Sequence, residues 1–371
     1  MHSSRRMMVG AALFAAASGV EAQTSVTLYG LADVFVQYLN NGGMGSWSQR
    51  SGGSSGSNFG LKGSEDLGNG VKAVFTLENG FNINNGTSFV DSTAMFYRQA
   101  WVGLSHDRYG SISFGRQYQP TFWAIYPTDP FRANEVLSPL AAAATAVDRN
   151  TFAVQTGGGR SSNAMVYKSP NVGGVQLWGM YALAASVTQP LPATTGNMLD
   201  LAVTYTGYGL YAALAYQKQH PGLKTVPGLP SALPSLSTEH FTGALAYRVG
   251  IVNLSFNYVY HRPADAPAGS LAARLNAAHP FSVMEAGATV QATAVDAIQL
   301  AGIQRVARGV HDNAWGVQLG AEHSLSKRTL IYARAGYIRN NGTSTMSWPG
   351  VTVSGLGRSQ TLAVTGLAHR F

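Results

Sequence analysis

Residues 251–262 read IVNLSFNYVYHR, and apolar and polar side chains alternate along them at almost every step. Leu254 and Phe256 fall on one face, whereas Ser255 and Asn257 fall on the other. The same period of two, which is typical of a β-strand with two unlike faces, recurs in residues 71–80, 198–205 and 314–325. A β-sandwich also alternates, but its polar face meets bulk water and carries many charges. Here the polar face holds mostly Gly, Ser, Asn, Gln and Thr, which favours a narrow, water-filled interior.

Short and long breaks between these strands follow each other along the chain. Short turns are expected at 65–70, 107–110, 170–174, 206–209, 249–250 and 326–328. Longer polar connections are expected at 40–57, 82–93, 185–197, 218–238, 263–283 and 341–359. Short turns at one end and long loops at the other are typical of outer-membrane barrels. About sixteen strands fit between the breaks, with the boundaries near 284–308 least defined. The sequence therefore predicts an all-β protein, a 16-stranded antiparallel transmembrane β-barrel.

The composition agrees with a barrel in a membrane and excludes several other classes. Of the 371 residues, 11% are charged and 43 are glycine, there is no cysteine, and the net charge is +8. Soluble domains carry about 25% charged residues. The lack of cysteine excludes a disulfide scaffold and a cysteine-zinc site. The basic charge does not indicate nucleic-acid binding, because no cluster of Lys and Arg exceeds two neighbours.

The N-terminus has the pattern of an export signal. Arg5 and Arg6 precede the apolar run of residues 7–17, and small residues lead to Gln23. We expect residues 1–22 to be a signal peptide and residues 23–371 to form the barrel. A short membrane anchor is the alternative, but the apolar run falls short of the roughly 20 residues that span a bilayer.

One long segment, residues 117–162, lacks a strand pattern. It carries apolar side chains such as Phe122, Trp123 and Phe131, together with an alanine-rich patch at 140–146. Loops of this length are usually functional. Because its apolar groups favour burial, we expect this segment to fold back inside the barrel rather than move freely at the surface.

Several stretches resemble the trimeric Gram-negative porins of the beta-proteobacterial type. They are SVTLYGLADVF (25–35), FGLKGSEDLGNGVKAVFTLENGFN (59–82), FYRQAWVGLSHDRYGSISFGRQY (96–118), NAMVYKSPNVGGVQLWGMYA (163–182), LSKRTLIYARAGY (325–337) and TLAVTGLAHRF (361–371). The resemblance spans the mature chain, although residues 218–310 match in pattern alone.

The resemblance implies a homotrimer in the outer membrane, in contact with outer-membrane lipid and lipopolysaccharide, without a cofactor, a metal or enzymatic activity. It implies passive diffusion of small hydrophilic solutes, with 117–162 as the third loop that narrows the pore. It also implies that the terminal Phe371 is read by the barrel-assembly machinery. A channel specific for one solute class is the alternative function, and a barrel used as an adhesin or an enzyme is a third. The G-x-S-x-G match at 52–56 lies in a Gly/Ser tract, outside the strand–turn–helix context of a hydrolase.

By position in the family, basic residues of the barrel wall face acids of the third loop. The expected wall bases are Arg98, Arg116, Arg160, Lys62 and Lys72, and the expected loop acids are Asp129, Glu135 and Asp148. Opposed charges across a narrow passage act on passing ions; alternatively, some of these arginines pin the loop through salt bridges. Strict alternation would turn Arg116 outward, so a break at the strand end is needed to bring it into the lumen. Asn58 stands where the family often has arginine. We expect weak anion selectivity.

Overall fold

The computed structural model describes residues 25–90, 92–145, 159–184, 196–224, 233–235, 237–264 and 279–371. The predicted signal peptide, residues 1–22, lies outside the described residues, as does Asp148.

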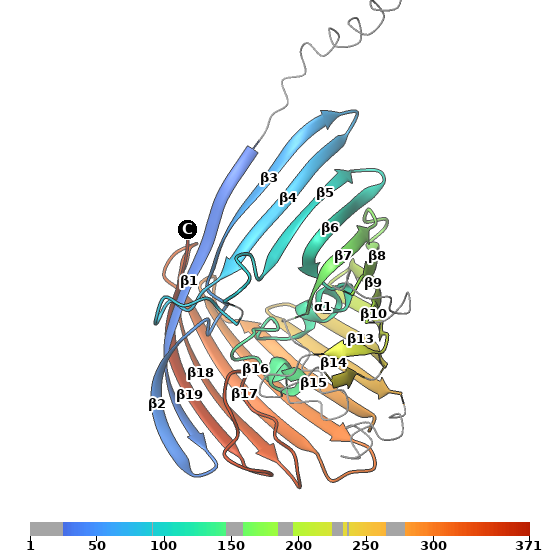
Figure 1. The fold of residues 1–371 in the computed structure, drawn as a ribbon. Helices are drawn as coiled ribbons and strands as arrows, with labels where there is room; N and C mark the ends of the chain where they lie inside the picture. Colours follow the sequence, from blue (N-terminus) through green and yellow to red (C-terminus); the bar gives the residue numbers. More distant parts are fainter. Residues whose placement is uncertain are drawn as a thin grey trace, which may run out of the picture.

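The described chain folds into one antiparallel sheet that closes on itself (Figure 1). Its strands are β1 (Ser25–Asn41), β2 (Met44–Ser51), β3 (Asn58–Gly68), β4 (Val71–Gly80), β5 (Gln99–His106), β6 (Gly110–Tyr118), β7 (Arg160–Lys168), β8 (Val175–Ala182), β9 (Met198–Gly207), β10 (Leu210–Gln219), β13 (Thr238–Val249), β14 (Val252–Pro263), β15 (Phe281–Gln291), β16 (Asp296–Ala307), β17 (Ala314–Ser324), β18 (Thr329–Asn340) and β19 (Gln360–Arg370). A separate small hairpin pairs β11 (Gly222–Lys224) with β12 (Leu233–Ser235). The ring closes where β1 pairs with β19, from Leu31 opposite Arg370 to Asn41 opposite Gln360.

β2 and β3 together make one wall strand. Both pair with β1, β2 along its C-terminal half and β3 along its N-terminal half. Counted as one, they bring the described barrel to the predicted sixteen strands. The expectation of a long polar loop over 40–57 is wrong, because Gly42 and Gly43 already turn the chain back into β2. Both glycines have positive φ, a conformation that suits a tight hairpin. Only residues 52–57 leave the sheet, at the break between β2 and β3.

The short turns predicted from the sequence are confirmed. Each of the six predicted ranges overlaps the junction of two consecutive strands, from β3–β4 to β17–β18, although residues 65–68 belong to β3. The undefined region 284–308 proves to be two strands, β15 and β16, joined by residues 292–295. The alanine-rich stretch, in which the alternation of polar and apolar residues is unclear, therefore forms a single hairpin.

The two faces of the wall differ as the alternation predicts. On β14, Leu254 and Phe256 are exposed on the outside, whereas Asn257 is fully buried on the inside. On β17, Val317 and Leu319 are exposed and Gln318 is buried between them. The outer face therefore offers apolar side chains to lipid, and the inner face carries polar groups.

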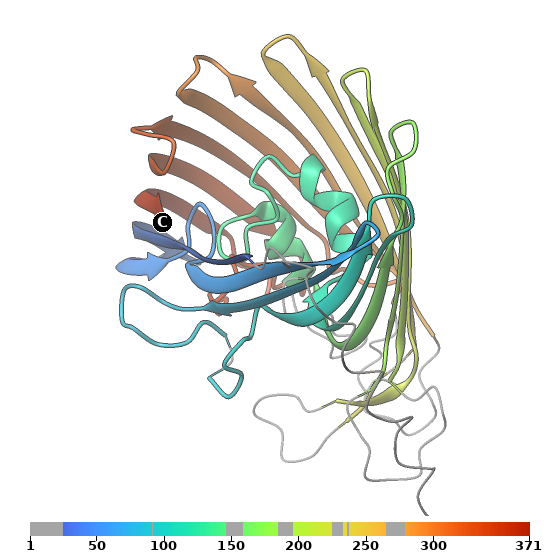
Figure 2. The ribbon, with the colours of Figure 1, turned by 90° about the horizontal axis from the view of Figure 1, so that it is seen from above.

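The connection from β6 to β7, residues 119–159, is called the third loop. Its described part contains α1 (Pro120–Ile125), a 3₁₀ turn η1 (Tyr126–Thr128) and α2 (Pro139–Thr145). Seen from above, the two helices lie inside the ring of strands (Figure 2). Ala124 of α1 packs on the buried, inward-facing Ala202, Ala213 and Ala244. None of the helices in the described ranges is long and apolar enough to cross a membrane.

A second connection also turns inward. Met346 and Trp348, between β18 and β19, are 0% and 1% exposed and belong to the same core as Leu137 and Leu140 of the third loop. The sequence predicts a polar loop there, yet its apolar side chains fill the lumen on this side. Both connections therefore pack together inside the barrel.

Candidate functional site

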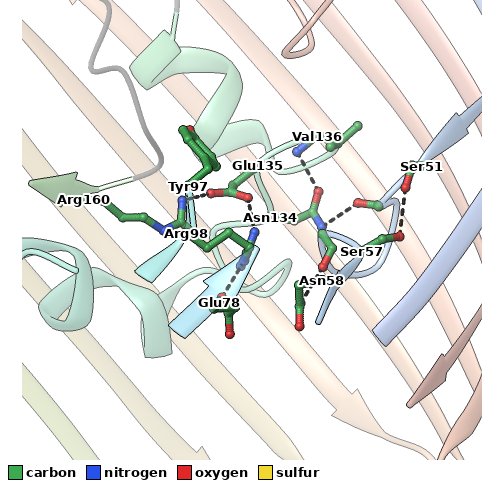
Figure 3. Close-up of polar contacts among 12 residues, drawn as sticks. Ser51, Ser57, Asn58, Glu78, Tyr97, Arg98, Asn134, Glu135, Val136 and Arg160 are labelled. Carbon is green, nitrogen blue, oxygen red and sulfur yellow. Dashed lines mark hydrogen bonds and ion pairs between the residues drawn. The ribbon is translucent and has the colours of Figure 1, made fainter. Parts of the chain in front are cut away.

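A cluster of charges joins the third loop to the barrel wall (Figure 3). Arg98 donates from Nε to Glu78 Oε1 at 2.6 Å and from a terminal nitrogen to Glu135 Oε2 at 2.7 Å. Its other terminal nitrogen donates to the Tyr118 hydroxyl at 3.0 Å. Arg160 pairs with the second oxygen of Glu135 and also donates to Tyr118. Glu135 is thus a bridge between two wall arginines.

Besides the third loop, four segments of the wall contribute to this cluster, and the sheet register brings these four together. Glu78 on β4 lies opposite Gln99, the first residue of β5, so Arg98 stands next to it. Tyr118 ends β6, Arg160 begins β7, and the two are register partners. The Arg160 guanidinium also lies over the Tyr118 ring, 4.2 Å from its centroid, a favourable cation–π geometry.

The environment of Glu135 favours its charged form. Burial acts to raise the pKa of this carboxyl, but the ion pairs with Arg160 and Arg98 outweigh burial and lower the pKa from 4.5 to about 2. Because Arg98 and Arg160 are balanced by Glu78 and Glu135, the cluster itself has no excess charge.

The Gly/Ser segment 52–57 forms a second inward element beside the third loop. It wraps around the carboxylate of Asp33, which accepts hydrogen bonds from the backbone N–H groups of Gly53, Ser54 and Ser55 at 3.1, 2.7 and 2.9 Å. The Tyr332 hydroxyl donates to the same carboxylate at 2.6 Å. The segment is therefore held in place by hydrogen bonds to a buried carboxylate.

The third loop is latched to this segment. The Asn134 side chain donates to the carbonyl oxygen of Gly52 at 3.0 Å and accepts from the N–H groups of Val136 and Leu137 at 2.9 and 2.6 Å (Figure 3). Nearby, the Asn58 side chain donates to the Gly56 carbonyl at 2.8 Å. Asn58 thus stabilises the segment through a local hydrogen bond.

The turn of the third loop is built around Asp129. Its carboxylate accepts from the N–H groups of Phe131 and Ala133 at 2.7 and 2.8 Å and from the Ser138 hydroxyl. Burial raises the pKa of this carboxyl above its ordinary value despite these hydrogen bonds. Arg132, between its two partners, has φ of 56° and is exposed.

The tip of this turn rests on glycines of the far wall. Pro130 lies against Gly287 and Phe131 against Gly320, so closely that a Cβ on either glycine would come within 3.0 Å of the loop. Arg334, the register partner of Gly320 on β18, lies over the Phe131 ring with its guanidinium 4.9 Å from the ring centroid. Because Gly287 and Gly320 have no side chains, the loop fits against this part of the wall in the lumen.

The structure brings together three of the predicted site residues, Arg98, Arg160 and Glu135. Arg116 lies beside them, with its guanidinium 5.0 Å from the Tyr97 ring centroid and hydrogen-bonded to the Ser162 hydroxyl at 2.9 Å. The strand break that Arg116 requires is present, because Gly115 has φ of 128° and the β6–β7 register shifts there.

The other predicted residues lie apart from the cluster. Lys62 is exposed on the inner face of β3, 5.4 Å from the Tyr29 ring centroid, and Lys72 is exposed next to the turn that starts β4. Asp129 shapes the loop locally and makes no ion pair in the described part of the chain. Phe371 lies against Gly30 at the seam and is 51% exposed.

Sequence reasoning missed Glu78, Tyr118 and Asp33. The signal for Glu78 was available, since it shares the polar face of residues 71–80 with Thr76. Asp33 likewise stands on the inner face of β1 with Gln37. No group of three metal-ligating side chains occurs within the described ranges.

Comparisons with known proteins agree with this geometry. The chain is 28% identical to outer membrane porin protein 32 of Delftia acidovorans over 379 aligned residues, covering 99% of this chain and all of that protein. An outer membrane porin of Bordetella pertussis is 30% identical over 62% of this chain and 63% of its own length. The anion-selective porin from Comamonas acidovorans superposes with a TM-score of 0.77 at 26% identity, covering 94% of this chain and 100% of that one.

More distant structures share the fold. The trimer form of OmpT from Vibrio cholerae has a TM-score of 0.65 at 15% identity, covering 94% of this chain and 99% of its own. The family model for Gram-negative porins matches residues 10–343. With a closed barrel, a third loop inside it and these relatives, the chain belongs to the Gram-negative porins, channel proteins of the outer membrane.

Proposed function

We propose that this porin is a general diffusion channel with a weak preference for anions, and that the third loop and its charge cluster form the constriction. The observation that supports this preference is the unequal exposure of acids and bases inside the barrel. Asp129 is 3% exposed, and the Glu135 side chain is 14% exposed and held by two arginines. Arg132 and Lys62 are exposed to the lumen.

An excess of accessible bases makes the potential in the passage positive. The Debye length is about 8 Å at physiological salt, so such charges act across most of a narrow pore. Arg116, half-buried beside the cluster, makes the potential more positive. Anions are therefore enriched at the constriction and cations depleted. The anion selectivity of the Comamonas acidovorans relative supports the same sign.

Reversal potentials in a KCl gradient across planar bilayers test the proposal. We expect a moderate preference for chloride, and a clear preference for potassium would overturn it. Replacing Arg132→Gln or Lys62→Gln should reduce the preference. Arg248→Gln, at the exposed turn between β13 and β14, is the matched control and should leave it unchanged.

Arg98→Ala should also shift selectivity toward cations, because it deprives both Glu78 and Glu135 of a partner. An unchanged reversal potential would remove Arg98 from the constriction. Liposome swelling with sugars of graded size tests the breadth of the channel. A general pore sorts these sugars by size alone, whereas strong discrimination between sugars of equal size would favour a substrate-specific channel.

We also propose a signal peptide at residues 1–22, a homotrimer, and recognition of the C-terminal strand by the barrel-assembly machinery. Exposed apolar side chains flank the seam on the outer face, including Val26, Leu28 and Leu367. Their burial between protomers would stabilise a trimer. We assign the protein no enzymatic activity, since the G-x-S-x-G match serves to bind Asp33 through backbone amides.

A further inference from the structure

Two acids lie together where the tip of the third loop, residues 128–131, meets the far wall. Glu285 on β15 is 0% exposed and shares the inner face of its strand with Gly287, against which Pro130 of the tip packs. Asp129, next to Pro130 and 3% exposed, is close enough to repel the Glu285 carboxylate. Two negative charges are therefore buried at one contact between the loop and the wall.

These two carboxylates are not balanced by neighbouring bases. Neither makes an ion pair within the described ranges. Arg334 attracts Asp129 from β18, but it is paired with Glu322 at 3.4 Å. Buried charges in proteins are normally paired or bind metal ions. The contact therefore has an excess of negative charge that a cation would offset.

Two oxygen atoms at this contact also have no hydrogen-bond partner among the described residues, Glu285 Oε1 and Asn257 Oδ1. Asn257 lies opposite Glu285 in the β14–β15 register and is 0% exposed as well. Its amide nitrogen donates to Glu285 Oε2 at 2.9 Å and to the Thr128 hydroxyl at 3.4 Å, so this amide stands between the wall and the loop. Buried polar atoms are nearly always partnered. A water molecule donates to such oxygens but leaves the charges unbalanced, whereas a cation binds the oxygens and offsets the charge.

We propose that this contact binds a Ca²⁺ ion, which fastens the tip of the third loop to β14 and β15. Glu285 Oε1 and Asn257 Oδ1 would be its ligands from the wall. The Thr128 hydroxyl would be its ligand from the loop, and Asp129 would add negative charge beside it. No three His, Cys, Asp or Glu side chains cluster in the described part of the chain, so the amide and the hydroxyl are needed to complete the site.

The ligand set favours calcium over other common cations. Carboxylate, amide and hydroxyl oxygens are hard ligands, which suit Ca²⁺ and Mg²⁺ rather than zinc or copper. Here they come from two strands and a loop. Ca²⁺ accepts such irregular arrangements, whereas Mg²⁺ demands a nearly regular octahedron and gives up its water reluctantly. We therefore expect calcium to bind more tightly than magnesium.

The proposal is tested by isothermal titration calorimetry of Ca²⁺ into the full-length porin, purified in nonionic detergent, free of lipopolysaccharide and washed with EDTA. We expect one ion per protomer, with a Kd of about 10⁻⁴ to 10⁻³ M, the range of extracellular calcium sites. Glu285→Gln should weaken binding by about tenfold or more, because it removes a charged ligand. Asn257→Asp should strengthen binding by about tenfold, because it adds one. Glu65→Gln, at an exposed carboxylate of β3, is the matched control and should bind calcium like the unmodified porin.

Thermal unfolding provides a second readout. In EDTA at slightly alkaline pH, Glu285→Gln should be at least as stable as the unmodified porin, because it removes an unbalanced buried charge. Added calcium should raise the unfolding midpoint of the unmodified porin and leave that of Glu285→Gln unchanged.

Three results would overturn the proposal. They are no calcium uptake by the unmodified porin, equal uptake by Glu285→Gln, and equal loss of uptake in Glu65→Gln. The first would mean that a proton offsets the charge of Glu285. If Glu285→Gln does not assemble, uptake by the unmodified porin and the expected gain in Asn257→Asp still decide the matter. Single-channel conductance shows independently whether each variant forms an open barrel.

Discussion

The two acids of the described third loop, Glu135 and Asp129, stand six residues apart and are held in opposite ways. Glu135 takes its partners from the wall, Arg98 and Arg160, which lie far from it in the sequence. Asp129 takes its hydrogen bonds from the loop itself, at Phe131, Ala133 and Ser138. The first acid therefore fixes where the loop sits, and the second fixes the shape of its turn.

The difference also has an electrostatic side. Glu135 is stabilised as an anion by two guanidinium groups, and its pKa is lowered to about 2. Asp129 accepts its hydrogen bonds from neutral groups, and burial raises its pKa although Arg334 and these hydrogen bonds act to lower it. Loss of charge should thus release the loop at Glu135 and be tolerated at Asp129.

The largest effect should come from Glu135→Gln. Arg160, whose side chain is fully buried, then loses its ion pair with this carboxylate. Removing one member of a buried ion pair costs about 3–5 kcal/mol. We expect a lower thermal unfolding midpoint in detergent and larger current fluctuations in single-channel records as the loop moves. Glu65→Gln, at an exposed site of β3, serves as the control, and equal behaviour of the two variants would contradict the anchoring role.

Acidification should reproduce part of that effect. Since the pKa of Glu135 is lowered on folding, its ion pairs contribute fully above pH about 4.5 and lose their contribution as the pH falls toward about 2. The raised pKa of Asp129 has the opposite sign, so protonation there relieves the burial of charge. Current noise of the unmodified porin should therefore rise as the pH falls from about 4.5 to about 2, whereas that of Glu135→Gln should stay constant. An equal rise of current noise in both proteins would show that a group other than Glu135 causes it.

A smaller effect is expected at the far wall, from Gly320→Ala. The added methyl would lie 2.8 Å from the Phe131 ring and 2.7 Å from Gln299 Oε1, so the tip must shift. Overpacking of this kind costs about 1–3 kcal/mol. Single-channel conductance should change while the anchor at Glu135 persists. Gly302→Ala, on the outer face with free space around it, should match the unmodified porin.

The smallest effect should follow from Asp129→Asn. The amide oxygen can still accept from Phe131 or Ala133, and one hydrogen bond of about 1 kcal/mol is lost. We expect a small decrease in the unfolding midpoint and unchanged reversal potential. A loss as large as that of Glu135→Gln would show that both acids anchor the loop.

The barrel could be predicted from the sequence because the pattern that indicates it lies within each single strand. Alternation at residues such as 251–262 follows from lipid on one side and water on the other, and it needs no knowledge of neighbouring strands. The tract 52–57 could not be predicted, because a run of Gly and Ser reads as a surface loop. Its inward position depends on Asp33 and Tyr332, which are distant in the sequence.

The candidate site was predictable in part for the same reason. The inward position of Arg98 and Arg160 followed from the family resemblance, whereas their pairing with Glu135 depends on how the third loop folds inside the barrel. Arg116 required a bulge that only the pairing of β6 with β7 specifies. Their contribution to selectivity remains a prediction for the bilayer experiments.

The seam between β1 and β19 has a consequence for how the protein is made. It joins Leu31 to Arg370, nearly the whole length of the chain apart, so this ladder can form only after the last strand has been delivered. Until then both edge strands carry unpaired backbone N–H and C=O groups, which lipid cannot satisfy and which invite pairing with other chains. The final strand, with Phe371 seated on Gly30, is therefore both the last piece of the wall and the step that ends the risk of aggregation.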